Sequence, residues 1–281
     1  MDFIKDILRG VAIGIANIIP GVSGGTMMVS MGIYNDVIGA VTGIFKHIKK
    51  SIKILLPYGI GMALGIVGLS FVIGYFFEHY PLQTALLFIG LIFGGLPMLM
   101  PKVAGRRPSL GELFVFLIFF ALIIWMQFWG EGTAKVLSVN LGTMGVLFFV
   151  GALAAATMVI PGVSGSMMLM SLGYYTPIID HINAFVVALV TLDFETVLYC
   201  TAILAPFGVG VAIGIFLISK VVEYLLEHHE RITYFAILGL VLASPIAVLS
   251  GMNLTAVGVF SILTGALMFA VGAVAAWALG K

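Results

Sequence analysis

Residues 19–24 read Ile-Pro-Gly-Val-Ser-Gly, and residues 160–165 repeat the same six residues inside a second strongly apolar stretch. Proline lacks the backbone N–H and glycine disfavours the helix interior, so each copy predicts a break in a membrane helix. The backbone groups freed by such a break are tolerated only where protein buries them or where they line a polar cavity. Two breaks in corresponding positions of two halves are typical of a transporter binding site.

The composition indicates an integral membrane protein. Hydrophobic residues make up 62% of the chain and charged residues 9%, and the mean hydropathy is +1.22, all typical of a chain dissolved in lipid. The net charge of +1 does not indicate a nucleic-acid partner, and we expect none. Cys200 is the one cysteine, which excludes an internal disulfide and a multi-cysteine metal site. The first nine residues carry two acids and two bases, so we expect no cleavable signal peptide.

The repeat extends beyond the two hexapeptides. At an offset of 141, residues 18–38 match residues 159–179 at eleven of 21 positions, and further on the offset becomes 149. Eight extra residues therefore lie near 181–195. We interpret this pattern as two homologous halves, 1–136 and 137–281, which together form one transmembrane domain.

Each half contains three apolar segments of the length that a bilayer requires. The predicted spans are residues 54–77, 82–100 and 110–129 in the first half, and 197–218, 232–249 and 255–279 in the second. A broken segment precedes each trio, at about 4–45 and about 141–180.

The placement of basic residues predicts how the broken segments cross. If each broken segment enters the membrane and returns to the face from which it came, twelve of the 13 Lys and Arg residues become cytoplasmic, and so do both termini. The predicted fold is therefore an all-α polytopic protein of two inverted-topology repeats, each a re-entrant helical hairpin followed by three transmembrane helices. Two full spans joined by a surface turn would give the same parity, so the charge pattern leaves that alternative open.

Opposed hairpins would bring the two break sequences together near the membrane midplane. The helix that begins after each break has free N–H groups and the positive end of its dipole there, which favours an anion. Serine and threonine add hydroxyl donors, and glycine lets a ligand approach the backbone. The alternative is structural: small residues pack helices closely and serine caps the next turn. The predicted substrate-binding residues are Pro20, Gly21, Val22, Ser23, Gly24, Gly25, Thr26, Pro161, Gly162, Val163, Ser164, Gly165 and Ser166.

The paired hexapeptides, the Met-rich continuations Thr26-Met27-Met28 and Ser166-Met167-Met168, and the 281-residue length resemble the bacterial polyprenyl-phosphate transporters of the PopT type. The resemblance covers essentially the whole chain. It implies a flippase that returns undecaprenyl phosphate, the lipid carrier of cell-wall sugar polymers, across the bacterial cytoplasmic membrane. The headgroup would need a polar passage, while the prenyl tail could stay in lipid.

The charge of such a headgroup exceeds what the two breaks supply. A phosphate monoester carries roughly 1.5 to 2 negative charges near pH 7, whereas two helix N-termini offer about one positive equivalent. We hypothesise that Arg9, Lys220 or a co-transported proton supplies the remainder. Asp36 and Asp180 follow the two breaks at similar distances and would either exchange protons at a cavity mouth or lie at the membrane interface.

The sequence does not favour an enzyme. It contains no Gly-Lys-Ser/Thr phosphate loop, and no base or carboxylate pair stands near either break. We expect no cofactor and no metal site. The alternative function is a channel or proton-coupled carrier for a small soluble anion that uses the same two breaks. The sequence leaves open the lipid chain length, the transport direction, the energy coupling and the oligomeric state.

Overall fold

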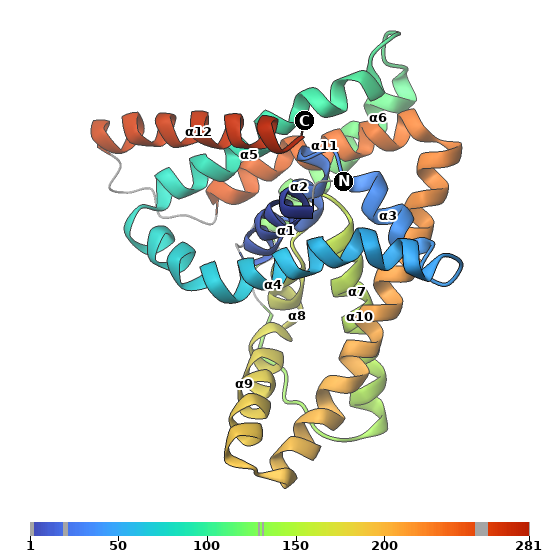
Figure 1. Cartoon of the computed structure of the whole chain (residues 1–281), viewed down its shortest axis with the longest axis vertical. Helices are drawn as coiled ribbons and strands as arrows, with labels where there is room; N and C mark the ends of the chain where they lie inside the picture. Colours follow the sequence, from blue (N-terminus) through green and yellow to red (C-terminus); the bar gives the residue numbers. More distant parts are fainter. Residues whose placement is uncertain (1–2, 19–21, 129, 131, 251–257, 281) are drawn as a thin grey trace.

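The computed structural model describes residues 3–18, 22–128, 130, 132–250 and 258–280, and within these ranges all regular structure is helical. Figure 1 shows the arrangement of the helices. The first six are α1 (Phe3–Ile18), α2 (Gly24–Ser30), α3 (Tyr34–Thr42), α4 (Ile48–His79), α5 (Pro81–Val103) and α6 (Leu110–Gln127). The remaining six are α7 (Leu141–Val159), α8 (Gly165–Leu172), α9 (Tyr175–Thr191), α10 (Phe194–His228), α11 (Glu230–Ser250) and α12 (Val259–Gly280).

Six of the described helices are long and apolar enough to cross a membrane: α5, α6, α7, α10, α11 and α12. The all-helical multi-pass class predicted from the sequence is therefore confirmed. The predicted span 54–77 lies within α4, and the start of the predicted span 255–279 falls partly outside the described residues. The 19 residues of α7 reach about 28 Å at 1.5 Å per residue, so its length leaves a full crossing open. Re-entrant hairpins and inverted repeats stay predictions.

Polar side chains define several helix starts. At α6, Ser109 accepts a hydrogen bond from the backbone nitrogen of Glu112, whose carboxylate accepts one from the Ser109 nitrogen in return. Asn140 caps α7 and Asp193 caps α10 through one backbone N–H each. These caps satisfy N–H groups that have no partner within their own helix.

Eight of the described helices pack in four pairs, and glycines set the closest approaches. In the α1–α4 pair, a Cβ on Gly14 would lie 2.5 Å from the Met62 carbonyl oxygen. In the α7–α10 pair, Gly210 lies directly against the backbone of Phe148. Small residues at these crossings let the backbones approach closely, as is usual between membrane helices.

The other two pairs join helices from different predicted halves. Helix α5 packs along α12, and α6 packs along α11 (Figure 1). These pairings correspond to one another when the predicted halves are exchanged, because α5 matches α11 and α6 matches α12 in chain order. The predicted halves are thus interlocked by their last helices.

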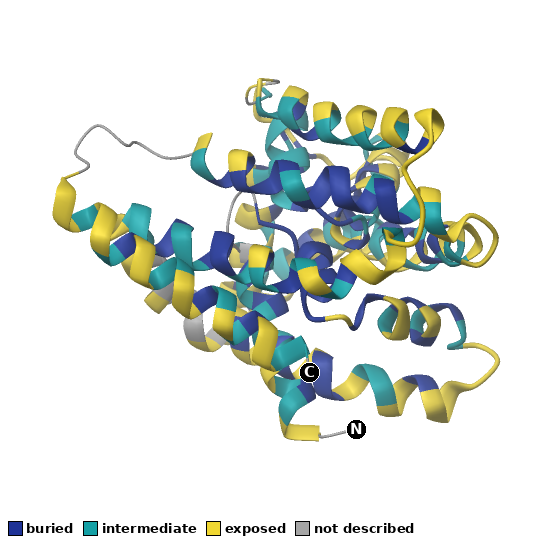
Figure 2. Cartoon of the chain, turned by 90° about the horizontal axis from the view of Figure 1, so that it is seen from above, coloured by how far each residue is buried: buried dark blue, intermediate teal, exposed yellow. Residues whose placement is uncertain are grey.

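Burial is concentrated at the centre of the helical assembly, where all seven residues of α2 are buried. The outer faces of the long helices carry exposed apolar side chains, and Figure 2 shows these exposed residues alternating with buried ones along single helices. Phe114 on α6 is 64% exposed and Leu263 on α12 is 65% exposed. Such surfaces suit contact with lipid.

The second arms of the two broken segments differ. Helix α3 has 9 residues and packs on α4 and α10, whereas α9 has 17 residues and packs mainly on α10. In Figure 1, α9 lies in the lower part of the molecule beside α10. The difference of eight residues between α3 and α9 accounts for the eight extra residues found in the second half of the sequence.

Candidate functional site at the paired helix breaks

The two helix breaks lie against each other. The Thr26 hydroxyl on α2 accepts a hydrogen bond of 2.7 Å from the backbone nitrogen of Gly162, and both groups are buried. The Ser23 hydroxyl lies 3.5 Å from the carbonyl oxygen of Ile160. Segments more than 130 residues apart in the chain thus meet at one point, as the sequence predicts for opposed breaks. Pro20 and Gly21 lie outside the described residues.

Two glycines make this close approach possible. A Cβ on Gly25 would lie 2.9 Å from the Val159 carbonyl oxygen and 3.1 Å from Pro161 backbone atoms. Gly162 has a φ of +81°, and a Cβ there would lie 2.7 Å from the Leu240 carbonyl oxygen. The left-handed backbone and the lack of space both require glycine at 162.

A tyrosine adds a third hydrogen bond to this contact. The Tyr34 hydroxyl at the start of α3 donates to the Val159 carbonyl oxygen at 3.2 Å, and Tyr34 is 4% exposed. Val159 is the last residue of α7, so no backbone N–H of that helix donates to its carbonyl oxygen. Tyr34 therefore satisfies a backbone group that the second break leaves free.

The two helix starts at the breaks are capped differently. At α8, the Ser164 hydroxyl accepts from the Met167 nitrogen at 3.4 Å and lies 3.0 Å from the Ser166 hydroxyl. At α2, the Asn17 side chain accepts from the Gly24 nitrogen at 3.2 Å. The structural alternative of the sequence analysis, in which serine caps the next turn, thus describes part of what Ser164 does.

The cavity beside the second break is small. It has a volume of about 10 Å³ and lies between the break and the facing parts of α6 and α11. Gln127 on α6 and Ser164 line it, as does Met167, whose sulfur accepts a 3.6 Å contact from the Gln127 amide. Because one water needs about 10 to 15 Å³ by this kind of measure, a phosphate headgroup requires the break to open.

The predicted charge partners lie apart from the breaks. Arg9 forms a 2.9 Å ion pair with the buried Asp6 and donates to the Leu279 carbonyl oxygen at 2.6 and 2.8 Å. Lys220 pairs with Glu223 at 2.8 Å, and Glu223 also accepts from Thr42 on α3. Both cations thus have partners in this conformation.

The two predicted aspartates are exposed. Asp36 lines a cavity of about 320 Å³ between α3 and α4, which His47 and Lys50 also line. Asp180 lies on the surface of α9. The described residues contain no group of three or more His, Cys, Asp or Glu side chains able to hold a metal ion.

The sequence analysis did not identify Tyr34 as part of the site, although Tyr34 matches Tyr175 in the repeat. It also missed the contact of the Asn35 amide with the Tyr234 hydroxyl, where the nitrogen lies at 2.9 Å. No local pattern predicts a bond between residues 199 positions apart. A repeated tyrosine directly after a repeated break was the available signal for Tyr34.

Comparisons with known proteins agree with the sequence analysis. Residues 13–261 match the family described as "VCA0040-like: Undecaprenyl phosphate translocase-like". A polyprenyl-phosphate transporter of Staphylococcus aureus is 31% identical, over 98% of this chain and 95% of its own length. A polyprenyl-phosphate transporter of Vibrio cholerae is 27% identical, over 87% of this chain and 77% of its own length. No solved structure matches significantly.

Proposed function

The chain belongs to the undecaprenyl phosphate translocase-like family, and from this premise we propose that it flips undecaprenyl phosphate across the bacterial cytoplasmic membrane. The lipid carrier would thereby be recycled for cell-envelope synthesis. The relatives named as polyprenyl-phosphate transporters, together with six helices long enough to cross a membrane, support a multi-pass membrane transporter of such a lipid. The flipping mechanism and the inner-membrane location are our proposal.

The observation that carries this proposal is the contact between the two identical breaks. Thr26 and Ser23 of the first break face the backbone of the second at Gly162 and Ile160. Opening this contact would release hydroxyl groups and backbone N–H groups together, and phosphate oxygens are strong acceptors for such donors. We place the headgroup there, near the midplane, with the prenyl chain in the surrounding lipid.

We further propose that the two halves are inverted repeats with re-entrant hairpins. Helix α5 of the first half packs on α12 of the second, and α11 of the second half packs on α6 of the first. The two contacts are equivalent when the halves are exchanged, which supports a pseudo-symmetric unit. The contacts between basic clusters support the predicted cytoplasmic side: the Arg231 side chain donates to the Arg106 carbonyl oxygen, and Arg9 donates to the Leu279 carbonyl oxygen near the C-terminus. The termini would both be cytoplasmic.

The charge of the headgroup needs a further positive group. Arg9 and Lys220 are the proposed partners, each after release from its present carboxylate, and a co-transported proton is the third possibility. Asp36 or Asp180 would then exchange that proton at the surface. Transport that is unchanged in Arg9→Ala and Lys220→Ala and is insensitive to a proton gradient would exclude all three sources.

The direct test uses protein reconstituted in liposomes that contain labelled undecaprenyl phosphate. An impermeant phosphatase is added outside, and the rate at which the inner-leaflet pool becomes accessible is measured. We expect fast exposure with the unaltered protein and at least a tenfold slower rate in Ser23→Ala/Ser164→Ala, because hydrogen bonds to a charged group are each worth about 1.5 to 3 kcal/mol.

The matched control is Thr191→Ala/Thr201→Ala, which also removes two hydroxyls, each bonded to a carbonyl of its own helix. We expect this control to transport normally. If exposure is no faster than in protein-free liposomes under either sign of proton gradient, the proposal is wrong, and the chain is then better tested as a channel or carrier of a small soluble anion.

A further inference from the structure

Another cavity lies next to the breaks, because Tyr34 lines it and also bonds Val159. It has a volume of about 100 Å³ and is lined by residues of α2, α3, α5 and α11 and by the turn between α2 and α3. This volume holds several water molecules, and therefore also the five heavy atoms of a phosphate group. The residues used below that line it are Gly32, Tyr34, Asn35, Met98, Lys102 and Tyr234.

The polar groups of this cavity come from three helices. The Asn35 amide faces the Tyr234 hydroxyl, with its nitrogen at 2.9 Å and its oxygen at 3.3 Å. The Lys102 ammonium lies 5.5 Å from the centre of the Tyr234 ring. One cation, one amide and one phenol at the same small cavity are the donors that a phosphate group requires.

Lys102 has a partner that an anion could replace. Its ammonium lies 2.7 Å from a carboxylate oxygen of Glu230. The two side chains are 43% and 52% exposed, and exposed pairs of this kind contribute little to stability. A dianionic phosphate would therefore compete well with Glu230 for the ammonium.

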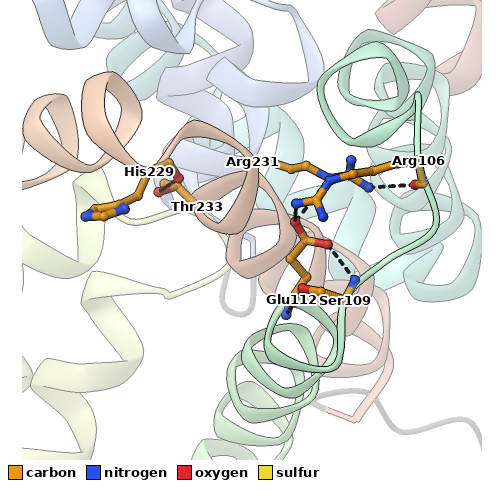
Figure 3. A network of polar contacts seen from close by, with 6 residues as sticks. All are labelled: Arg106, Ser109, Glu112, His229, Arg231 and Thr233. Carbon is orange, nitrogen blue, oxygen red and sulfur yellow. Dashed lines mark hydrogen bonds and ion pairs between the residues drawn. The ribbon is translucent and has the colours of Figure 1, made fainter.

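The neighbouring arginines are more firmly engaged, as Figure 3 shows. One carboxylate oxygen of the buried Glu112 lies 2.8 Å from Arg106 and 3.2 Å from Arg231. Arg231 also donates to the Arg106 carbonyl oxygen at 2.7 Å, and Ser109 binds the other oxygen of Glu112. This network holds the start of α6 against α11. Neither arginine lines the cavity, whereas Lys102 does.

Tyr34 forms the inner wall between this cavity and the paired breaks. It lines the cavity, and its hydroxyl donates to the Val159 carbonyl oxygen, immediately before the second break. The cavity is thus one buried side chain away from the proposed headgroup position.

We propose that this cavity binds the phosphate group of the transported lipid between the predicted cytoplasmic surface and the paired breaks. Lys102 supplies the charge, and the Asn35 amide and the Tyr234 hydroxyl supply hydrogen bonds. The apolar side chain of Met98 lies beside the start of the lipid chain. This inference rests on the proposed function and adds a second binding position to it.

A local readout tests the binding. In a Met98→Cys/Cys200→Ala protein, the introduced thiol lines the cavity, and its rate of labelling by a thiol reagent is measured in detergent. The probes are farnesyl phosphate, inorganic phosphate and uncharged farnesol. At ten times its dissociation constant, farnesyl phosphate should slow the labelling about tenfold, while farnesol should have no effect. Protection by inorganic phosphate alone would show a site for the free anion and overturn the assignment to a lipid.

Four substitutions in the Met98→Cys/Cys200→Ala protein distinguish a binding role of Lys102 from a structural one. Lys102→Met should raise the concentration of farnesyl phosphate needed for protection about tenfold, and Lys102→Arg should restore most of the affinity. Glu230→Gln should lower that concentration, because it removes the competing carboxylate. Lys135→Met, an exposed cation in the loop before α7, is the control and should match the parent.

Among these variants, either of two results would also overturn the proposal: unchanged protection in Lys102→Met, or weaker protection in Glu230→Gln, which a purely structural ion pair predicts. Failure here is separable from failure of the proposed function. Rapid lipid exposure in liposomes with no protection at Met98→Cys would remove this position only, whereas absence of exposure in liposomes would remove the proposed transport whatever the labelling shows.

Discussion

The hydroxyl of Thr26 illustrates how the break residues act in the closed site. The sequence predicts it as a ligand donor, and the structure shows it accepting a hydrogen bond from the Gly162 nitrogen. The N–H of Gly162 would otherwise be buried without a partner, which costs about 1 to 3 kcal/mol. Thr26 thus holds the breaks together in this structure and, in the proposed open state, would face the headgroup.

Thr26→Val tests this role because it keeps the shape of the side chain and removes the acceptor. We expect the free energy of unfolding to fall by about 1 to 3 kcal/mol, measured by denaturant titration in detergent. Thr26→Ser keeps the acceptor and should lose less than half as much. Equal losses in the two variants would mean that packing of the Thr26 methyl, rather than the hydrogen bond, stabilises the contact.

Local chemistry at the breaks was predictable, and the contacts across them were not. Proline and glycine predicted where the chain leaves the helix, because their effects act within a few residues. The alternative that serine caps the next turn describes Ser164 but not Ser23, whose side chain makes no capping hydrogen bond. The contact of Ser23 with Ile160 and the bond from Tyr34 to Val159 depend on how distant segments pack. Their geometry is set by the whole fold, and no short pattern encodes it.

At the scale of helices, glycine positions decide which faces meet. Helix α10 has Gly208 and Gly210 two residues apart, and they point in different directions. Gly210 lies against the backbone of Phe148 on α7, whereas a Cβ on Gly208 would have no neighbour within 4 Å. The sequence predicts both as helix residues but does not say which one faces α7.

Gly210→Val and Gly208→Val form a matched pair on one helix. Gly210→Val should lower the free energy of unfolding by about 1 to 3 kcal/mol or more, because the new side chain must push α7 away. Gly208→Val should change it by less than 1 kcal/mol, because the new side chain meets no neighbour. Both substitutions have the same effect on helix propensity, so that effect does not distinguish them. Thermal unfolding in one detergent measures both, and similar losses in the two would contradict the assigned α7–α10 interface.

For the whole molecule, the environments of α3 and α9 are unequal, which bears on the proposed transport cycle. Thr42 on α3 donates to Glu223 on α10 at 2.6 Å, and α9 packs mainly on α10. If the halves are inverted repeats, the opposite state would exchange these arrangements. The α3–α10 contact would then open during each transport cycle.

Cross-linking tests whether the α3–α10 contact must open. In a Thr42→Cys/Glu223→Cys/Cys200→Ala protein, a short reversible thiol cross-linker should stop lipid exposure in liposomes, and reductant should restore it. Thr42→Cys/Cys200→Ala treated in the same way is the control and should keep its rate. Normal transport by the cross-linked protein would show that α3 and α10 stay together throughout the cycle.

Most of the candidate spans followed from hydropathy, but α7 was predicted as part of a re-entrant segment, and the partners of the helices did not follow. Five of the six predicted spans coincide with described helices long enough to cross a membrane, because length and apolarity are properties of the segment itself. The pairing of α5 with α12 and of α6 with α11 joins segments from different halves. Nearly uniform apolar surfaces carry little information about which helix lies beside which.

This exchanged pairing bears on how such a chain could have arisen. A single-copy ancestor with only α1 to α6 would have left α5 and α6 without the helices that now cover them. If the two predicted halves arose by duplication, such an ancestor would have needed a second identical chain, with each chain packing its last helices on the other. The predicted halves 1–136 and 137–281, produced as separate polypeptides, should accordingly assemble only when they are made together.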